Sequence, residues 1–303
     1  MGTKMVWPAA CLRRVSNRLC RCHFLESRDR SLARIGVKQS ARKVNFMNDR
    51  IDLETQYLHA HLDRGVLHVR IDRLAKRNSM TQDMYRGLKK ALVMTDETPE
   101  IDAMCIKGMD GWFCVGGDMS GEMENRDALM SEPDPTDHHP FRHLERCRKI
   151  VVCSVAGKCH AGGLNLVLFS DITIAGKSAT FRVPELLRGI PDPHMSARLP
   201  YFVGLAKAKY MMLTAAEISA DEADAWGIVA KTVEDDELEA ETERVLDIVR
   251  QTGPRARMLA KDDINRRLPA YDVRLLQREI MSPEMTEGMM AFLEKRAPKW
   301  PPV

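Results

Sequence analysis

Phe113-Cys114-Val115-Gly116-Gly117-Asp118-Met119 and Ala156-Gly157-Lys158-Cys159-His160-Ala161-Gly162-Gly163-Leu164-Asn165 are the two segments that decide how this chain is interpreted. Each follows an apolar stretch, and the second opens an apolar run that ends at Phe169, so each predicts a strand that gives way to a helix. Glycine lets the backbone come close to a ligand, and N–H groups at the start of a helix carry partial positive charge. Together the segments predict an oxyanion hole, a site that stabilises negative charge on a carbonyl oxygen in a transition state.

The rest of the chain predicts an α/β protein. Short apolar strands are expected at residues 66–71, 103–106, 151–155 and 172–175. Helices are expected at residues 82–95, 163–169 and 196–202, and the chain is expected to be mostly helical from residue 206 onward. The proline-rich stretch at residues 133–140 is expected to be a loop.

Composition fits an enzyme with one main domain. The chain has 303 residues, of which 44% are hydrophobic and 29% are charged, so it can bury a substantial core. No run of sequence approaches the roughly 18 apolar residues that a membrane span needs, and we expect a cytoplasmic or organelle-matrix protein without a membrane partner. The eight cysteines show no metal-ligand spacing, since Cys20-Arg21-Cys22 is shorter than the usual C-x-x-C pair. They predict buried free thiols and no metal site.

Charge is distributed unevenly along the chain. Residues 1–46 hold 11 Lys or Arg against two acids, a net charge of +9, which leaves −6 for the remainder because the whole chain carries +3. An acidic body argues against nucleic acid as the main partner. Two interpretations of the basic leader stay open. It is either a disordered or start-site extension ahead of Met47, or an organellar transit peptide.

Several further motifs follow one another in a recognisable order. They are Asp72-Arg73-Leu74-Ala75-Lys76-Arg77-Asn78-Ser79-Met80, Asp171-Ile172-Thr173-Ile174-Ala175, Pro184-Glu185, Ile218-Ser219-Ala220-Asp221-Glu222-Ala223 and Glu287-Gly288-Met289-Met290-Ala291-Phe292-Leu293-Glu294-Lys295-Arg296. With the two glycine segments, they make residues 50–303 resemble the crotonase superfamily, the enoyl-CoA hydratase and isomerase family.

The resemblance implies a crotonase (ClpP-like) fold of repeated ββα units. It implies a core at residues 47–205 that contains the active site. A helical region at residues 206–303 would then form a homotrimer or a dimer of trimers and complete the CoA site. The implied substrate is an acyl-CoA thioester, with coenzyme A as part of the substrate and no other cofactor.

The resemblance also assigns the oxyanion hole and the CoA contacts. The backbone N–H groups of Val115 and Gly162 would hold the thioester oxygen, with Gly116 and Gly163 beside them. The nucleotide end of CoA would meet basic residues of the entry motif and of the closing helix of a neighbouring subunit. The candidates, each of which is equally an ordinary surface charge, are Lys76, Arg77 and Lys295.

The catalytic positions depart from those of the resembled hydratases, which carry two glutamates. Asn165 stands at the first position, and an amide holds a water or a carbonyl but cannot exchange a proton near neutral pH. Glu185 stands at the second, and a lone buried carboxyl with a raised pKa suits the transfer of one proton between carbons. Asp192 lies near the extra acid of the family's dienoyl-CoA isomerases. It is equally the N-cap of a helix that begins near His194.

Three functions remain open at this level. The leading one is isomerisation or hydration of an enoyl-CoA through an oxyanion-stabilised enolate and Glu185. The second is hydrolysis or lysis of a carbon–carbon bond in a ketone or β-diketone, in which His160 and His194 would line the pocket. The third is a catalytically degenerate member of the family that acts as a binding or scaffold protein.

Overall fold

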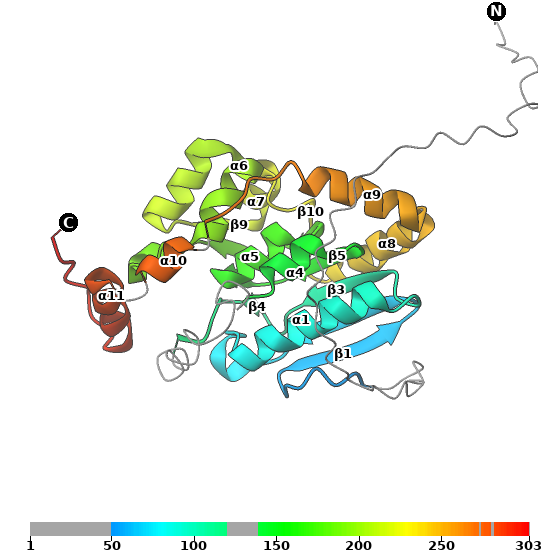
Figure 1. Cartoon of the computed structure of the whole chain (residues 1–303), viewed down its shortest axis with the longest axis horizontal. Coiled ribbons are helices and arrows are strands. Elements are labelled where there is room, and N and C mark those ends of the chain that lie inside the picture. The colour runs from blue at the N-terminus through cyan, green and yellow to red at the C-terminus, as the bar shows by residue number, and fades with distance from the viewer. Residues whose placement is uncertain (1–49, 120–138, 273, 280–281, 303) are drawn as a thin grey trace, which may run out of the picture. The chain divides into compact units, whose positions relative to one another are not determined.

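The structure is a computed structural model, and it describes residues 50–119, 139–272, 274–279 and 282–302 (Figure 1). The predicted basic leader at residues 1–46 lies outside the described residues, and so do residues 133–138 of the predicted loop. No helix of the described part of the chain is long and apolar enough to cross a membrane.

A six-stranded sheet forms the centre of the molecule. Its strands, in spatial order, are β1 (Leu58–Asp63), β2 (Val66–Ile71), β3 (Ala103–Lys107), β5 (Ile150–Val155), β7 (Ile172–Gly176) and β10 (Lys231–Val233). β1 pairs antiparallel with β2 and the other neighbours pair in parallel. The four strands predicted from apolar runs are the four inner strands of this sheet. Such runs are typical of parallel strands that are covered on both faces.

A second sheet consists of short strands that alternate along the chain with strands of the large sheet. It consists of β4 (Trp112–Cys114), β6 (Lys158–His160), β8 (Thr180–Arg182) and β9 (Glu217–Ser219), of which the first three are parallel. The large-sheet strands β3, β5 and β7 are each followed directly by a strand of this small sheet. This alternation, with helices after the strand pairs, confirms the fold predicted by resemblance. The three-residue strands themselves were not predicted, because so short a run has no periodicity to detect.

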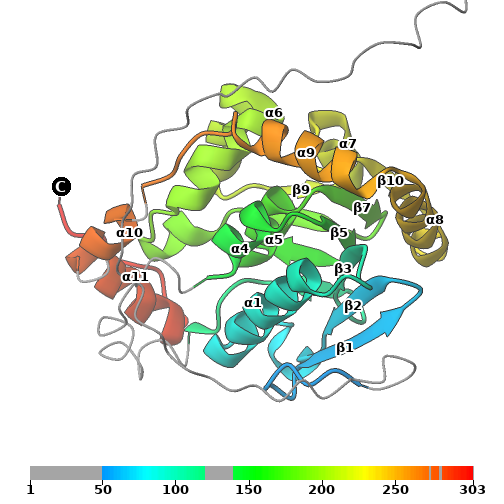
Figure 2. The ribbon, with the colours of Figure 1, turned by 45° about the vertical axis from the view of Figure 1, so that its right-hand side comes forward.

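The large sheet is covered on both faces (Figure 2). Along β3, Met104 and Ile106 join the main core with α1 (Gln82–Glu97) and α5 (Gly162–Phe169). Ala103 and Cys105 instead pack with α8 (Leu238–Gln251). This alternation follows from the two-residue period of a strand. α5 has seven of its eight residues buried, which is why its sequence is apolar all round.

The remaining helices are α4 (Phe141–Arg146), α6 (Pro193–Thr214), α7 (Ala220–Trp226), α9 (Pro254–Asn265), α10 (Arg274–Glu279) and α11 (Pro283–Leu293), with 3-10 turns η1 (Leu74–Lys76) and η3 (Glu185–Arg188). α6 is longer than the helix predicted at residues 196–202. It begins earlier because Asp192 caps it and Pro193 occupies its first turn, and it continues past a non-helical residue at Gly204. The five described cysteines are buried free thiols, as expected.

Candidate active site

The two glycine segments meet directly. Gly116 follows β4 with φ +95°, and a Cβ there would lie 2.6 Å from the Cβ of Ala161 and 3.1 Å from the backbone nitrogen of Gly162. Only glycine allows so close an approach with a positive φ. The predicted neighbours Val115 and Gly162 are therefore brought together at one place, where β4 ends and α5 begins.

The entry motif clamps the first of these segments. Asn78 is fully buried, and its Nδ2 donates to the carbonyl of the first residue of β4 at 2.7 Å while its Oδ1 accepts from the Arg73 backbone N–H at 2.7 Å. Arg73 forms an ion pair with Asp118 at 2.6 Å, with both side chains nearly buried. The backbone of Met80 donates to the carbonyl of Gly116 and accepts from the N–H of Asp118, both at 2.8 Å. This motif thus holds the first glycine segment in place.

Helix α5, which begins in the second glycine segment, has no side-chain cap at its N-terminus. α5 starts at Gly162, and the preceding Ala161 makes no capping hydrogen bond through its side chain. N–H groups of the first helical turn lack partners inside the helix, so this terminus is suited to an anionic oxygen. A Cβ on Gly163 would lie 2.2 Å from the carbonyl oxygen of Cys114, whereas one on Gly162 would meet the Cα of Gly116 at 3.3 Å. Gly163 is therefore required by packing, whereas a Cβ on Gly162 would make a tight contact that small shifts could relieve.

The carboxyl of Glu185 is buried and its pKa is raised. Glu185 is the first residue of η3, and its Oε2 has no hydrogen-bond partner among the described residues. Burial, and then the charge of Asp192, raise the pKa of Glu185 from 4.5 to about 8. At neutral pH the carboxyl is mostly protonated, and it exchanges its proton readily around that pH.

Asp192 is the N-cap of α6, one of the two roles that the sequence left open, and it also contacts Asn165. Its Oδ1 caps α6 by accepting from the backbone N–H groups of His194 at 2.8 Å and Met195 at 3.0 Å. Its Oδ2 accepts from Nδ2 of Asn165 at 2.7 Å. Burial acts to raise the pKa of Asp192, but His194 and the hydrogen bonds from Met195 and Asn165 outweigh burial, so the pKa lies below 3.8. Asp192 is therefore ionised beside a mostly protonated Glu185.

Asn165 presents an acceptor to the site. The amide is only 2% exposed, and because Nδ2 faces the Asp192 carboxylate, Oδ1 faces away from it. This oxygen has no partner within the described chain. A buried acceptor without a partner costs free energy unless a water or a substrate group donates to it.

The two predicted histidines are placed differently. The imidazole of His194 lies beside the acids, with Nδ1 3.6 Å from Oδ1 of Asp192, and its ring packs against Tyr271 at 4.6 Å. His160 is engaged by the neighbouring strands, since its Nε2 lies 3.2 Å from Oγ1 of Thr180 and 3.0 Å from Oε2 of Glu217. Burial lowers the pKa of His160 to about 4, so the ring is neutral.

The three basic residues suggested for CoA lie at element ends. Arg77 has φ +55° and places its guanidinium 5.5 Å from the centre of the Trp112 ring, while Lys76 ends η1. Lys295 follows α11 and is exposed. Among the residues that the structure describes, none of these three side chains has an ion-pair partner.

The closing helix α11 packs on the turn that carries Glu185. A Cβ on Gly288 would lie 2.4 Å from the carbonyl of Arg188, and one on Gly189 would lie 2.9 Å from the carbonyl of Glu284. The guanidinium of Arg188 also covers the ring of Phe292 at 4.3 Å. Within one chain, α11 thus packs against the end of η3, the turn that begins at Glu185.

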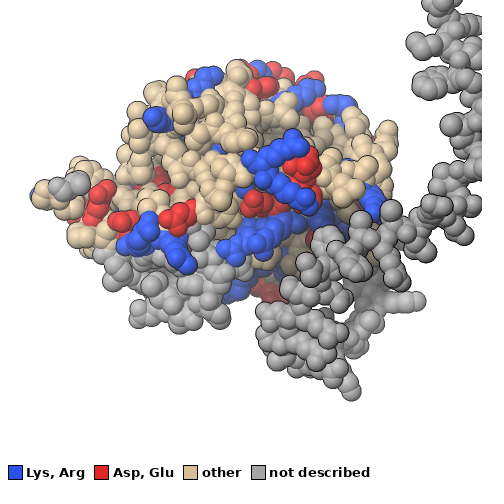
Figure 3. All heavy atoms as spheres, turned by 45° about the horizontal axis from the view of Figure 1, so that its top comes forward, with Lys and Arg blue, Asp and Glu red and all other residues tan. Residues whose placement is uncertain are grey.

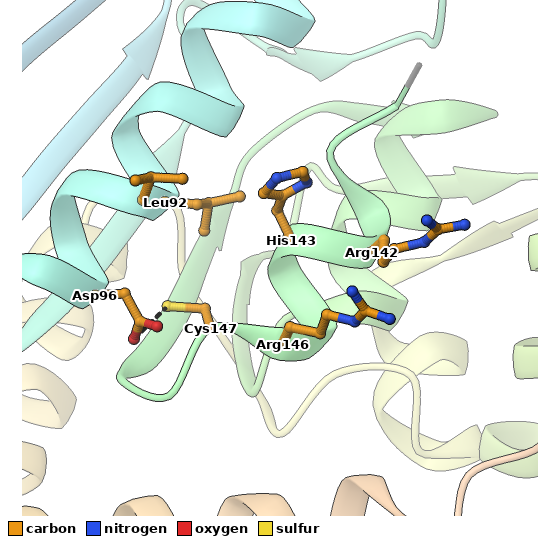
Figure 4. Close-up of a pocket in the computed structure, with 7 residues that line it drawn as sticks. Leu92, Asp96, Arg142, His143, Arg146 and Cys147 are labelled. Atoms are coloured by element: carbon orange, nitrogen blue, oxygen red, sulfur yellow. Dashed lines mark hydrogen bonds between the residues drawn. The ribbon is translucent and has the colours of Figure 1, made fainter. Parts of the chain in front are cut away.

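Two hollows elsewhere contain none of the predicted site residues. A pocket of about 300 Å³ between α1 and α4 contains Asp96 and Cys147, whose Sγ donates weakly to the carboxylate at 3.9 Å (Figure 4). Burial raises the pKa of Cys147 to about 11, so the thiol is not a nucleophile at neutral pH.

A groove of about 750 Å³ between α4 and α9 is lined by arginines, but Arg148 pairs with Asp96 and Arg266 pairs with Asp262. Basic and acidic side chains are likewise intermixed on the face shown in Figure 3.

Sequence reasoning missed Tyr85. This side chain of α1 is 1% exposed, and its hydroxyl lies 3.3 Å from the position of a Cβ on Gly162. A tyrosine on the buried, otherwise apolar face of a predicted helix is a signal that was available, because a buried hydroxyl needs a polar environment. His139 was missed as well, and its ring meets the ring of Tyr85 edge-on at 4.9 Å.

Comparison with known proteins agrees with this geometry. A family model described as enoyl-CoA hydratase/isomerase matches residues 61–302. The chain is 31% identical over 236 residues to a crotonyl-CoA hydratase of Syntrophomonas wolfei, covering 75% of this chain and 90% of that protein. It is 30% identical over 260 residues to the 1,2-epoxyphenylacetyl-CoA isomerase of Escherichia coli K12, covering 81% of this chain and 98% of that protein.

Solved structures give the same result. A crystal structure of an enoyl-CoA hydratase/isomerase from Pseudoalteromonas atlantica T6c is similar with a TM-score of 0.70 at 25% identity, over 81% of this chain and all of that chain. The match includes both glycine segments, the entry motif and the closing helix, since the family model spans almost all the described residues. This chain therefore belongs to the enoyl-CoA hydratase/isomerase family and has the crotonase fold.

Proposed function

We propose that this protein acts on an acyl-CoA thioester, shifting a carbon–carbon double bond or adding water across it. The observation that carries the proposal is the buried Glu185 carboxyl, with a partnerless oxygen and a pKa of about 8. It is connected to the oxyanion segments through Asp192, which raises the pKa of Glu185 and is held by Asn165 of α5. A group that both takes and gives a proton near neutral pH is what a double-bond shift requires.

In the double-bond shift, ionised Glu185 removes a proton from C2 of a 3-enoyl thioester. The electron pair of the broken C–H bond moves to the thioester oxygen, where the N–H groups of Val115 and Gly162 stabilise the enolate. Glu185, now protonated, returns its proton to C4 as the double bond moves to C2–C3. One carboxyl serves both steps, so no second acid is needed.

Hydration uses the same groups with a water held by Asn165. The partnerless Oδ1 of Asn165 accepts a hydrogen bond from the water, and ionised Glu185 accepts its other proton. The water oxygen bonds to C3, the thioester becomes an enolate, and Glu185 delivers the proton to C2. The names of the two relatives, a crotonyl-CoA hydratase and an epoxyphenylacetyl-CoA isomerase, support both branches of the proposal.

The other two hypotheses from the sequence have less support. A carbon–carbon hydrolase was suggested by two histidines, but Thr180 and Glu217 engage His160, which leaves only His194 beside the acids. A scaffold without chemistry would gain nothing from a buried carboxyl whose ionisation burial opposes, and such groups gather at functional sites.

We also propose that the chain forms a homotrimer or a dimer of trimers. Support comes from large apolar side chains that α6 leaves exposed, namely Tyr201, Leu205, Tyr210 and Leu213. A face of this kind on a stable helix marks an interaction surface. The nucleotide end of CoA would be held by Lys76, Arg77 and Lys295, with no further cofactor. Sedimentation equilibrium of the full chain measures the assembly, and a monomer at micromolar concentration contradicts it.

The function is tested by incubating the purified chain with crotonyl-CoA and, separately, with a 3-enoyl-CoA. Absorbance follows loss of the conjugated enoyl thioester in the first case and its formation in the second. Glu185→Gln is expected to lower turnover by about 10²- to 10⁴-fold. Glu234→Gln, at an exposed glutamate of the same chain, serves as the matched control. Turnover of the 3-enoyl substrate alone identifies an isomerase, loss of crotonyl-CoA identifies a hydratase, and no turnover of either contradicts the proposal.

A further inference from the structure

Tyr85 places a phenolic hydroxyl where the two glycine segments, residues 113–119 and 156–165, meet. A Cβ on Gly162 would lie 3.3 Å from the Tyr85 hydroxyl and 3.3 Å from the Cα of Gly116. The hydroxyl therefore occupies the side that glycine leaves open at Gly162, the residue whose N–H group is assigned to the thioester oxygen. The side chain is 1% exposed, so the hydroxyl acts in a medium of low dielectric constant.

Helix α1, which carries Tyr85, is anchored at its start to the first glycine segment by backbone hydrogen bonds. Met80 makes two hydrogen bonds of 2.8 Å to that segment, to the carbonyl of Gly116 and from the N–H of Asp118. The next residue, Thr81, caps α1, and the N–H of Tyr85 donates to the carbonyl of Thr81 at 3.0 Å in the first turn. Met80, which is hydrogen-bonded to the first glycine segment, therefore lies about one helical turn before Tyr85 in the chain.

The ring of Tyr85 is also held in orientation. It meets the ring of His139 edge-on, with centres 4.9 Å apart and planes at 77°, and His139 stacks on Phe141 at 5.2 Å. Phe141 is 2% exposed at the start of α4. The ring is therefore held from α1 and α4, which fixes the position of the hydroxyl oxygen.

We propose that Tyr85 is a catalytic residue that donates a third hydrogen bond to the thioester oxygen, beside the N–H groups of Val115 and Gly162. The inference rests on the proposed acyl-CoA substrate. A donor aimed in advance at the place where charge develops stabilises the transition state more than the ground state, because no reorientation is needed when the charge appears. Tyr85 would then make α1 a third element of the oxyanion hole, together with β4 and α5.

The alternative is that Tyr85 only fills the core, as phenylalanine or leucine would. The two interpretations differ in one respect that can be measured. A hydroxyl that donates to the thioester oxygen polarises the carbonyl of a bound ligand, whereas a hydroxyl that serves only packing leaves the carbonyl unchanged.

The experiment is difference infrared spectroscopy of butyryl-CoA labelled with ¹³C at the thioester carbon, which binds but has no double bond to react. It is bound to the full chain, to Tyr85→Phe and to Tyr210→Phe, a control that removes the same hydroxyl from a side chain 54% exposed on α6. Thermal melting and sedimentation confirm that the variants are folded and equally assembled. We expect a downward shift of the carbonyl stretch on binding to the unmodified chain and to Tyr210→Phe, and a clearly smaller shift in Tyr85→Phe.

Turnover gives the second readout. Tyr85→Phe is expected to lower kcat by about 100-fold with little change in KM, as for the loss of one oxyanion donor. Equal carbonyl shifts and equal kcat in Tyr85→Phe and the unmodified chain overturn the role of Tyr85 and leave the proposed function intact. A chain that binds no butyryl-CoA and turns over neither enoyl substrate overturns the proposed function, and this inference with it.

Discussion

Asn165 donates a hydrogen bond of 2.7 Å from its amide Nδ2 to Oδ2 of Asp192, and this contact joins helix α5 to the start of α6. An ionised carboxylate only accepts, so the contact determines which way the amide faces. The consequence is a division of roles among three polar side chains. Asp192 remains charged, Glu185 keeps its proton up to a pH of about 8, and Asn165 offers an acceptor oxygen.

Asp192→Asn is expected to shift the pH dependence of turnover. In the proposed reaction ionised Glu185 is the base, so kcat/KM, which reports the pKa of the free enzyme, should rise with pH in the unmodified chain and level off above about 8. Because the charge of Asp192 contributes to the raised pKa of Glu185, its removal should move the rising limb to lower pH by roughly one unit. Asparagine still caps α6, so the helix start is preserved. The measurement is kcat/KM from pH 5 to 9, and an unmoved limb contradicts the prediction.

Glu185→Gln is expected to become more stable than the unmodified chain as pH rises. The pKa of Glu185 is raised on folding, so the stability contributed by its protonated form is complete below pH 4.5 and is lost as pH rises through about 8. Each pH unit in that window costs the unmodified chain about 1.4 kcal/mol, and the sum is on the order of 5 kcal/mol. Glutamine has no proton to lose. Urea unfolding at pH 5, 6.5 and 8, at one fixed protein concentration, should show a free-energy difference that grows with pH; a constant difference would mean that Glu185 titrates normally.

Asn165→Ala should separate hydration from isomerisation. In the proposed mechanism hydration needs Oδ1 of Asn165 to hold a water, whereas the double-bond shift needs only Glu185 and the proposed oxyanion hole. We expect turnover of crotonyl-CoA to fall by at least about tenfold more than turnover of a 3-enoyl-CoA, in line with the loss of one hydrogen bond to a reacting group. The assay compares kcat on both substrates in one preparation. Equal losses on both would show that Asn165 acts only by holding Asp192.

Much of the large sheet followed from the sequence, because its inner strands are continuous apolar runs such as 66–71, which the structure gives as β2 (Val66–Ile71). The resemblance assigned Val115 and Gly162 to one site, and the structure shows that Gly116, the residue after Val115, lies against Gly162. The contact of Asn165 with Asp192 did not follow, since it joins residues from two helices and depends on how those helices pack. Tyr85 escaped notice for the same reason, because its proximity to Gly162 is a tertiary contact that periodicity does not reveal.

Of the two adjacent glycines, replacing Gly163 by alanine is expected to lower the stability of the fold, whereas replacing Gly162 is expected to lower activity. In Gly163→Ala the new Cβ would lie 2.2 Å from the backbone carbonyl oxygen of Cys114, so α5 or β4 must move. A loss of more than about 3 kcal/mol in the free energy of unfolding is expected, which far exceeds the gain of up to about 1 kcal/mol that alanine gives inside a helix. In Gly162→Ala the closest atoms lie at 3.3 Å, a contact that shifts of a few tenths of an ångström relieve.

Gly162→Ala should therefore fold, yet its methyl group would enter the space between the oxyanion segments and the Tyr85 hydroxyl. Displacing the thioester oxygen from one N–H donor lowers kcat by about 100-fold or more. Thermal melting and kcat measured on both variants test the pair, with Gly253→Ala as a control at a glycine whose Cβ position meets, among the described residues, only the Cβ of Ala256 at an ordinary contact distance of 3.8 Å. If Gly162→Ala kept full activity, the new methyl group would not displace the thioester oxygen, and this oxygen would not lie on the side of Gly162 that faces Tyr85.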